Sequence, residues 1–160
     1  MTKGSRMRIL GGLAGVAALA TAALVALPAS GTAPAGSAFF AKLDGEHETP
    51  HADPDGYGTF SASFNGTKLC YGLTVAKIAN PNAAHIHQGA VGANGPIKVA
   101  LTAPATGASG ASGKCVTVPA ALASAIKANP SKYYVNVHNG GFPGGAVRGQ
   151  LFQATAAQDK

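Results

Sequence analysis

Apolar and polar residues alternate through most of the chain after residue 38. The alternating runs are short and are bounded by Gly, Asn, Asp and Pro, a pattern typical of strands, whose successive side chains point to opposite faces of a sheet. We therefore predict eight strands, at residues 38–43, 58–65, 68–75, 83–87, 97–101, 113–118, 133–138 and 146–153. This spacing predicts an all-β fold, an antiparallel sandwich or barrel.

Three stretches are expected to form other structure. Asn65-Gly66 is a strong signal for a tight turn, so the second and third strands should form a hairpin. Residues 118–130 are rich in alanine, with Pro119 suited to the first helical turn and a proline at the end, and they predict one short helix. Residues 102–113 have few side chains to bury and are expected to be a mobile loop.

The N-terminal residues form a separate compositional block. Basic residues at positions 3, 6 and 8 precede an apolar run at 9–27, and Ala33-Pro34-Ala35 matches the small-x-small rule for cleavage. This order predicts a secretory signal peptide at residues 1–35 and a single domain at 36–160, secreted or extracellular. Because the apolar run is long, an uncleaved N-terminal membrane anchor stays open as an alternative, and it is the only membrane contact that we expect.

The charge of the chain does not point to a polyanionic partner. The sequence has twelve basic and six acidic residues, a formal net charge of +6. Without residues 1–35, nine basic residues remain against six acidic ones, about +3. The lysines of the domain are scattered and have no aromatic residues interleaved with them, so we expect no nucleic-acid binding.

The two cysteines, Cys70 and Cys115, each lie in a predicted strand. In an exported chain they meet an oxidising compartment, and a single disulfide is the economical interpretation. The closed loop of about 45 residues would stabilise the fold by about 3 to 4 kcal/mol on the chain-entropy model. The alternative, a cysteine ligand or nucleophile, requires a thiol that stays reduced outside the cell.

Two histidines one residue apart carry the first candidate chemistry. His85 and His87 lie in one predicted strand, so both side chains project from the same face. In the strand 133–138 the same alternation places Tyr134, Asn136 and His138 on one face and two valines on the other. If these strands are neighbours, three imidazoles can meet, and three neutral histidines with an open position suit Zn²⁺ or Cu²⁺.

A structural interpretation of the same histidines stays open. They precede a loop with glycines at positions 89, 92 and 95, followed by Pro96. In this alternative the imidazoles hydrogen-bond to backbone carbonyls of the glycine loop and fix its shape. We do not expect the loop to hold a phosphate, because no helix and no Lys-Ser/Thr pair follow it.

Several polar residues are candidates for a supporting role. Metal-compatible side chains gather within ten residues at Glu46, His47, Glu48, His51, Asp53 and Asp55, although a solvated loop is the favoured interpretation. His47 and His51 are left open as extra ligands or surface residues. From this group we select Glu48 as a hydrogen-bond partner for a histidine, and from the strand 133–138 we add Asn136 in the same supporting role. Arg148 is expected to pair with Glu48 or Asp44, with anion binding near the histidines as the alternative.

Two long motifs carry a resemblance to a known family. AAHIHQGAVGANGPIKVAL (83–101) and YYVNVHNGGFPGGAVRGQL (133–151) closely resemble the chordin-type, or CHRD, domain, and the match extends back through GTKLCYGLTV to LDGEHETP. It covers roughly residues 39–152. The resemblance implies an immunoglobulin-like or Greek-key β-sandwich or barrel. In chordin such repeats belong to a protein that sequesters growth factors, but the resemblance implies no particular partner for a lone domain.

The histidine strand is also similar to that of Cu/Zn superoxide dismutase. This likeness is limited to the x-His-x-His strand and the class of sheet, and the further ligands and bridging histidine of that enzyme have no counterpart that we can place. A dismutase-like metalloenzyme is therefore only a third alternative. No nucleophile elbow or paired acids are marked, and we expect no enzyme.

Two hypotheses rank ahead of the dismutase-like alternative. In the first, the protein is a secreted, disulfide-bonded β-domain that binds a transition metal, copper or zinc, through His85, His87 and His138. In the second, it is an extracellular interaction module for a protein or a cell-wall glycan, and the histidines are structural.

Overall fold

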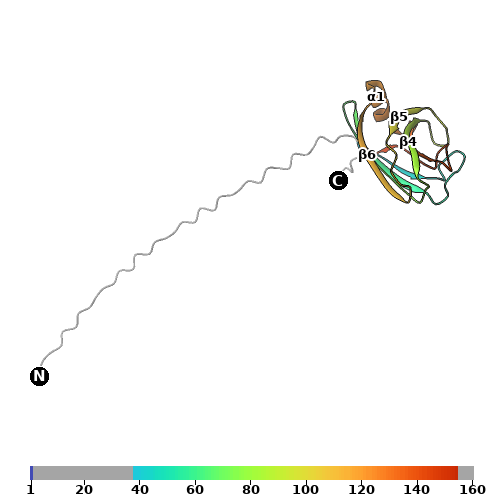
Figure 1. Ribbon diagram of the computed structural model, residues 1–160. Helices are drawn as coiled ribbons and strands as arrows, with labels where there is room; N and C mark the ends of the chain where they lie inside the picture. The colour runs from blue at the N-terminus through green and yellow to red at the C-terminus, as the bar shows by residue number, and fades with distance from the viewer. Residues whose placement is uncertain (2–37, 155–160) are drawn as a thin grey trace, which may run out of the picture. The chain divides into compact units, whose positions relative to one another are not determined.

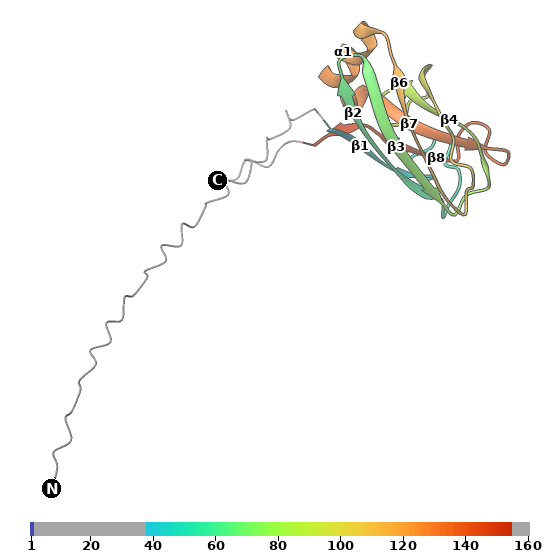
Figure 2. The same cartoon turned by 60° about the vertical axis from the view of Figure 1, so that its left-hand side comes forward.

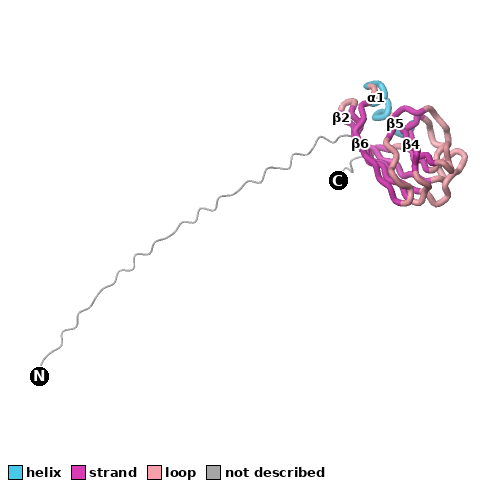
Figure 3. The backbone as a smooth tube through the Cα atoms, in the orientation of Figure 1, coloured by secondary structure: helices cyan, strands magenta, loops and turns pink. Residues whose placement is uncertain are grey.

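The alternating segments become the strands of one antiparallel sheet. The structure, a computed structural model, describes residue 1 and residues 38–154. Its elements are β1 (Ala38–Asp44), β2 (Tyr57–Asn65), β3 (Lys68–Ala76), β4 (Pro81–Gln88), β5 (Ile97–Leu101), β6 (Ser109–Thr117), α1 (Ala120–Ala128), a 3₁₀ turn (Pro130–Lys132), β7 (Tyr133–Asn139), β8 (Val147–Gln150) and β9 (Phe152–Gln153). Strand dominates and α1 is the one α-helix of the described residues, which Figure 3 shows in cyan.

The sheet curves into a nearly closed barrel. The strand order is β5-β4-β7-β8-β1-β2-β3-β6, and β9 pairs with β1 (Figures 1 and 2). Thr102, the residue after β5, is linked to the opposite end of the sheet: Ser112 Oγ of β6 donates to the Thr102 carbonyl, and Thr102 N–H donates to the Tyr71 hydroxyl of β3. The predicted fold class, all-β and antiparallel with one short helix, is confirmed, and its shape is closer to a barrel than to two separate layers.

The apolar half of each alternating run fills the barrel. On β4 and β7 these residues are Ala84, Ile86, Val135 and Val137, all 1% exposed or less. The helix α1 begins directly after Pro119 and buries Ala123 and Ile126 against this core. The hairpin predicted at Asn65-Gly66 joins β2 to β3, with Gly66 at a positive φ of 60°.

Two strands differ from the sequence prediction by more than a shift of one or two residues at their ends. Residues 102–113 were expected to form a mobile loop, but β6 already begins at Ser109 and pairs with β3 along its whole length. Backbone hydrogen bonds to β3 hold this part of the strand, although its side chains are small. A search for hydrophobic alternation does not detect such a segment. The single strand expected at 146–153 is divided at Leu151 into β8, which lies between β7 and β1, and β9, which pairs with β1.

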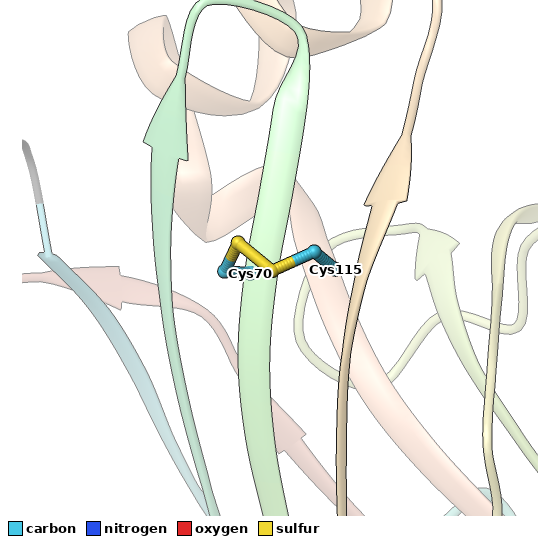
Figure 4. The surroundings of a disulfide bond; sticks show 2 residues. All are labelled: Cys70 and Cys115. Carbon is cyan, nitrogen blue, oxygen red and sulfur yellow. A yellow bond between two sulfur atoms is a disulfide. The ribbon is translucent and has the colours of Figure 1, made fainter.

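Cys70 and Cys115 form a disulfide, as predicted. They face each other directly in the register of β3 and β6, and Figure 4 shows the bond joining the two neighbouring strands. The bond therefore attaches an end strand of the sheet to the hairpin beside it.

The predicted signal peptide lies, apart from Met1, outside the described residues. Within the described part of the chain, no helix is long and apolar enough to cross a membrane.

Candidate metal centre

The candidate site lies on the outer face of the barrel wall, where β4 and β7 run side by side. In their antiparallel register His85 lies opposite Asn136, His87 opposite Tyr134, and His138 opposite Ala83. Directly opposed residues of an antiparallel pair share a face. The residues between them fill the core, so alternation forces the histidines to the outside.

The three imidazoles converge as the sequence suggested. The ring centroids of His85 and His138 are 5.1 Å apart, and those of His85 and His87 are 5.5 Å apart. One nitrogen from each of the three rings lies within 4.8 Å of the others, and His85 Nδ1 is 3.2 Å from His138 Nε2. Two imidazole nitrogens bound at about 2.0–2.1 Å to one tetrahedral ion lie about 3.3 Å apart, so this pair already has the required spacing.

Backbone carbonyl groups orient two of the rings. His87 Nδ1 lies 2.9 Å from the carbonyl oxygen of Gly95, and His138 Nδ1 lies 3.1 Å from that of Pro143. Since a carbonyl oxygen only accepts, Nδ1 carries the hydrogen in both rings and each Nε2 keeps its lone pair. Ligating histidines in proteins are commonly held by such a bond from the other ring nitrogen.

His87 Nε2 is the most informative atom of the site. His87 is only 8% exposed, and this nitrogen has no hydrogen-bond partner among the described residues. A buried acceptor without a partner is energetically costly and is seldom left so in folded proteins. A cation beside the nitrogen would satisfy it.

The site favours neutral imidazoles. Burial lowers the pKa of all three histidines, and for His85 the neighbouring rings of His138 and His87 lower it further. The carbonyls of Gly95 and Pro143 partly oppose this shift in the pKa of His87 and His138. A neutral imidazole is the form that binds a metal ion.

The structural interpretation is compatible with the same geometry. His87 does fix the glycine loop, at Gly95, and His138 fixes the loop after β7, at Pro143. Among the described residues, the one side-chain hydrogen-bond contact of His85 is with His138, another histidine of the group. The structural interpretation therefore explains the hydrogen bonds of His87 Nδ1 and His138 Nδ1. It does not explain why the three rings converge.

Arg148 forms a buried ion pair beside the histidines. Its Nε donates to Glu48 Oε2 at 2.7 Å, so of the two partners suggested for Arg148 the structure selects Glu48. Glu48 thus contacts the arginine rather than a histidine. Burial raises the pKa of Glu48, while the hydrogen bond and positive charge of Arg148 act in the opposite direction.

Asn136 lies next to this ion pair, beneath Gly145. A Cβ added at Gly145 would collide with Glu48 Oε1 and with both amide atoms of Asn136. Glu48 Oε1 and Asn136 Oδ1 are buried, and neither has a hydrogen-bond partner among the described residues. Glu48, Asn136 and Arg148 therefore form one polar group on the histidine face.

Sequence reasoning missed Tyr134 and the loop residue Asn94. The ring of Tyr134 stacks on His87, with centroids 4.9 Å apart and planes 10° apart. Asn94 accepts a hydrogen bond from Arg148 and donates one to the Thr49 carbonyl. The alternation that placed Tyr134 on the histidine face was the available signal, whereas nothing local marks Asn94.

The polar loop after β1 makes no comparable site. His47 Nδ1 pairs with Asp44 Oδ1, and both residues are at the surface. Among the described residues, the three histidines are the only group of three or more His, Cys, Asp or Glu side chains placed to hold one ion.

Comparison with known proteins gives one match. The family model of the CHRD domain matches residues 39–151, which include all three histidines, the ion pair and both cysteines. No curated protein and no solved structure matches the chain.

Proposed function

The chain belongs to the CHRD domain family, and on that premise we propose that its domain binds a transition-metal ion, copper or zinc, through His85, His87 and His138. The proposal rests on the buried lone pair of His87 Nε2, which has no partner among the described residues, at a place where one nitrogen from each of three imidazoles lies within 4.8 Å of the others. Three neutral nitrogen ligands leave at least one coordination position for water or another ligand.

Three imidazoles suit both ions. Imidazole is a ligand of intermediate softness, and Cu²⁺ binds more tightly than Zn²⁺ to most nitrogen sites. We favour copper for this reason and propose that the protein, exported by residues 1–35, sequesters or transfers the ion outside the cell. The proposal involves binding and no catalytic step.

The hydrogen bonds indicate which nitrogen of each histidine would bind the ion. His87 and His138 use Nδ1 for the carbonyls of Gly95 and Pro143, so they would bind through Nε2. His85 would bind through Nδ1, the atom that already faces His138. The carbonyls of Gly95 and Pro143 therefore hold two of the three ligands in place before an ion binds.

Calorimetric titration tests the proposal. The purified chain, free of any polyhistidine tag, is titrated with Cu²⁺ and with Zn²⁺, and we expect one equivalent to bind with micromolar or tighter affinity. His138→Ala should weaken binding at least tenfold, while His47→Ala, which removes an exposed histidine outside the group, should leave it unchanged. Equal binding by the wild type and His138→Ala, or no binding at all, would exclude this site.

The hydrogen bonds from His87 and His138 to backbone carbonyls support a second candidate function. If His87 and His138 serve only to fix their loops, the domain is an extracellular interaction module for a protein or a cell-wall glycan. In that case His87→Ala lowers the melting temperature equally with and without metal. Stabilisation of the wild type by added Cu²⁺ or Zn²⁺, absent in His87→Ala, favours the metal site instead.

A further inference from the structure

Tyr134 connects the candidate metal ligand His87 to the buried ion pair. Its aromatic ring lies 4.9 Å from the His87 ring and nearly parallel to it, and the guanidinium carbon of Arg148 lies 4.6 Å from the Tyr134 centroid. His87 comes from β4 and Arg148 from β8, the strands on the two sides of β7. The tyrosine ring is therefore in contact with both neighbouring strands.

The hydroxyl of Tyr134 acts on the same ligand by a second route. Tyr134 Oη accepts a hydrogen bond from Gly95 N–H at 3.1 Å, while the carbonyl oxygen of Gly95 holds His87 Nδ1. Gly95 packs closely against β4, since a Cβ there would collide with the backbone of Gln88. One tyrosine thus fixes the plane of the His87 ring by stacking and the position of its carbonyl partner by hydrogen bonding.

Arg148 makes this arrangement rigid from the other side. It is 3% exposed, and its three nitrogens donate to Glu48, to the Ala93 carbonyl and to Asn94 Oδ1. Ala93 and Asn94 directly precede Gly95 in the loop between β4 and β5. The arginine and the tyrosine therefore hold the same loop, at adjacent residues.

We propose that Tyr134 is a positioning residue of the metal centre, one that holds His87 in the orientation in which its Nε2 faces His85 and His138. This inference rests on the proposed function. A ligand held in place before binding loses less conformational freedom when the ion arrives, so the positioning increases affinity.

Three variants separate positioning from general stability. Tyr134→Leu removes the stack and the hydroxyl, and Tyr134→Phe removes the hydroxyl alone. Tyr133→Leu is the matched control, because Tyr133 is buried to a similar degree, 4% exposed against 2% for Tyr134, but packs in the core. A purely structural tyrosine would affect stability in the same way at either position.

The affinity for Cu²⁺ and Zn²⁺ is measured by competition with a chromophoric chelator, at a temperature where each variant is folded. We expect Tyr134→Leu to raise the dissociation constant about tenfold, Tyr134→Phe to raise it about fivefold, and Tyr133→Leu to change it less than twofold. In ¹⁵N spectra, His87 of Tyr134→Leu should no longer show a single Nδ1–H form. If Tyr134→Leu does not fold, Tyr134→Phe alone decides by the same comparison.

Two results would overturn the inference, and they are distinguishable. If the wild type binds metal and both Tyr134 variants bind equally well, Tyr134 does not position the ligand although the proposed function stands. If the wild type binds neither ion, the proposed function fails and the inference fails with it.

Discussion

His85 Nδ1 and His138 Nε2 lie 3.2 Å apart, within hydrogen-bonding distance. His138 donates from Nδ1 to the Pro143 carbonyl, so in its neutral form its Nε2 is an acceptor. His85 must then supply the hydrogen from Nδ1. In the metal-free protein, a proton lies where an ion bound to both rings would lie.

The tautomer of His85 is therefore expected to change when metal binds. Without metal, ¹⁵N spectra should show His85, His87 and His138 all as Nδ1–H forms. On addition of Zn²⁺, His85 should change to the Nε2–H form, because its Nδ1 becomes a ligand, while His87 and His138 keep their Nδ1–H bonds to carbonyls. A His85 that keeps Nδ1–H in the zinc-loaded protein would contradict the assigned ligand atoms.

The stability of the metal-free protein should fall as the pH is lowered from about 6.5, the ordinary histidine value. Burial lowers the pKa of the three histidines in the folded state, so the unfolded chain binds more protons below this pH and is favoured. Above it, these groups contribute no pH dependence. Each histidine can contribute a slope of at most about 1.4 kcal/mol per pH unit.

Urea unfolding between pH 7.5 and 5.5, in the presence of a chelator, measures this slope. His138→Asn removes one of the three groups and should make the slope shallower. The same slope in the variant and the wild type would show that His138 has an ordinary pKa in the folded state.

Removing one partner of the buried ion pair Glu48–Arg148 should lower the free energy of unfolding more than expected from the effect of replacing both partners together. Arg148→Met leaves a buried carboxylate without its partner, and Glu48→Gln leaves a buried guanidinium, so each is expected to lower the free energy of unfolding by about 3–5 kcal/mol. The double variant should lose less than the sum, because the two residues interact directly. Denaturant titration of the four proteins gives the interaction energy, with exposed Lys98→Met as a control that should stay within about 0.5 kcal/mol. Strict additivity would show that the pair contributes nothing as a pair.

Gly145 should tolerate no side chain, whereas its neighbour Gly144 should. Gly145 has a φ of 140°, and a Cβ there would collide with Glu48 and Asn136, so Gly145→Ala is expected to cost at least about 1–3 kcal/mol. A Cβ at Gly144 meets no atom within 4 Å, and Gly144→Ala should stay within about 0.5 kcal/mol. Equal melting temperatures for the two variants would show that the polar group beneath Gly145 can rearrange freely.

The barrel could be predicted largely because most strands alternate clearly. Alternation also placed Tyr134, Asn136 and His138 on one face, and the convergence with His85 and His87 required in addition that β4 and β7 be neighbours in a suitable register. The early start of β6 at Ser109 escaped prediction because Ser, Gly and Ala carry no hydrophobic pattern, and its pairing with β3 depends on backbone hydrogen bonds.

The surroundings of the histidines were harder to predict. The acceptors for His87 and His138 are backbone carbonyls of Gly95 and Pro143, and no side-chain motif marks a carbonyl. Similarly, Arg148 and Glu48 are separated by 100 residues, so the sequence offered Asp44 as an equal partner. Such contacts are set by how loops fold over the sheet, which a single sequence does not specify.

The alternation of core and histidine residues along β4 and β7 has a consequence for folding. If β4 shifted by one residue against β7, the faces of the strand would exchange, and histidines would enter the core. If it shifted by two so that His85 moved opposite Tyr134, the faces would be kept, but His85 would no longer lie beside His138. Neither of these shifted registers would assemble the three ligands, so capture of a metal ion would disfavour them and would selectively retain the chains in which the histidines of β4 and β7 have met.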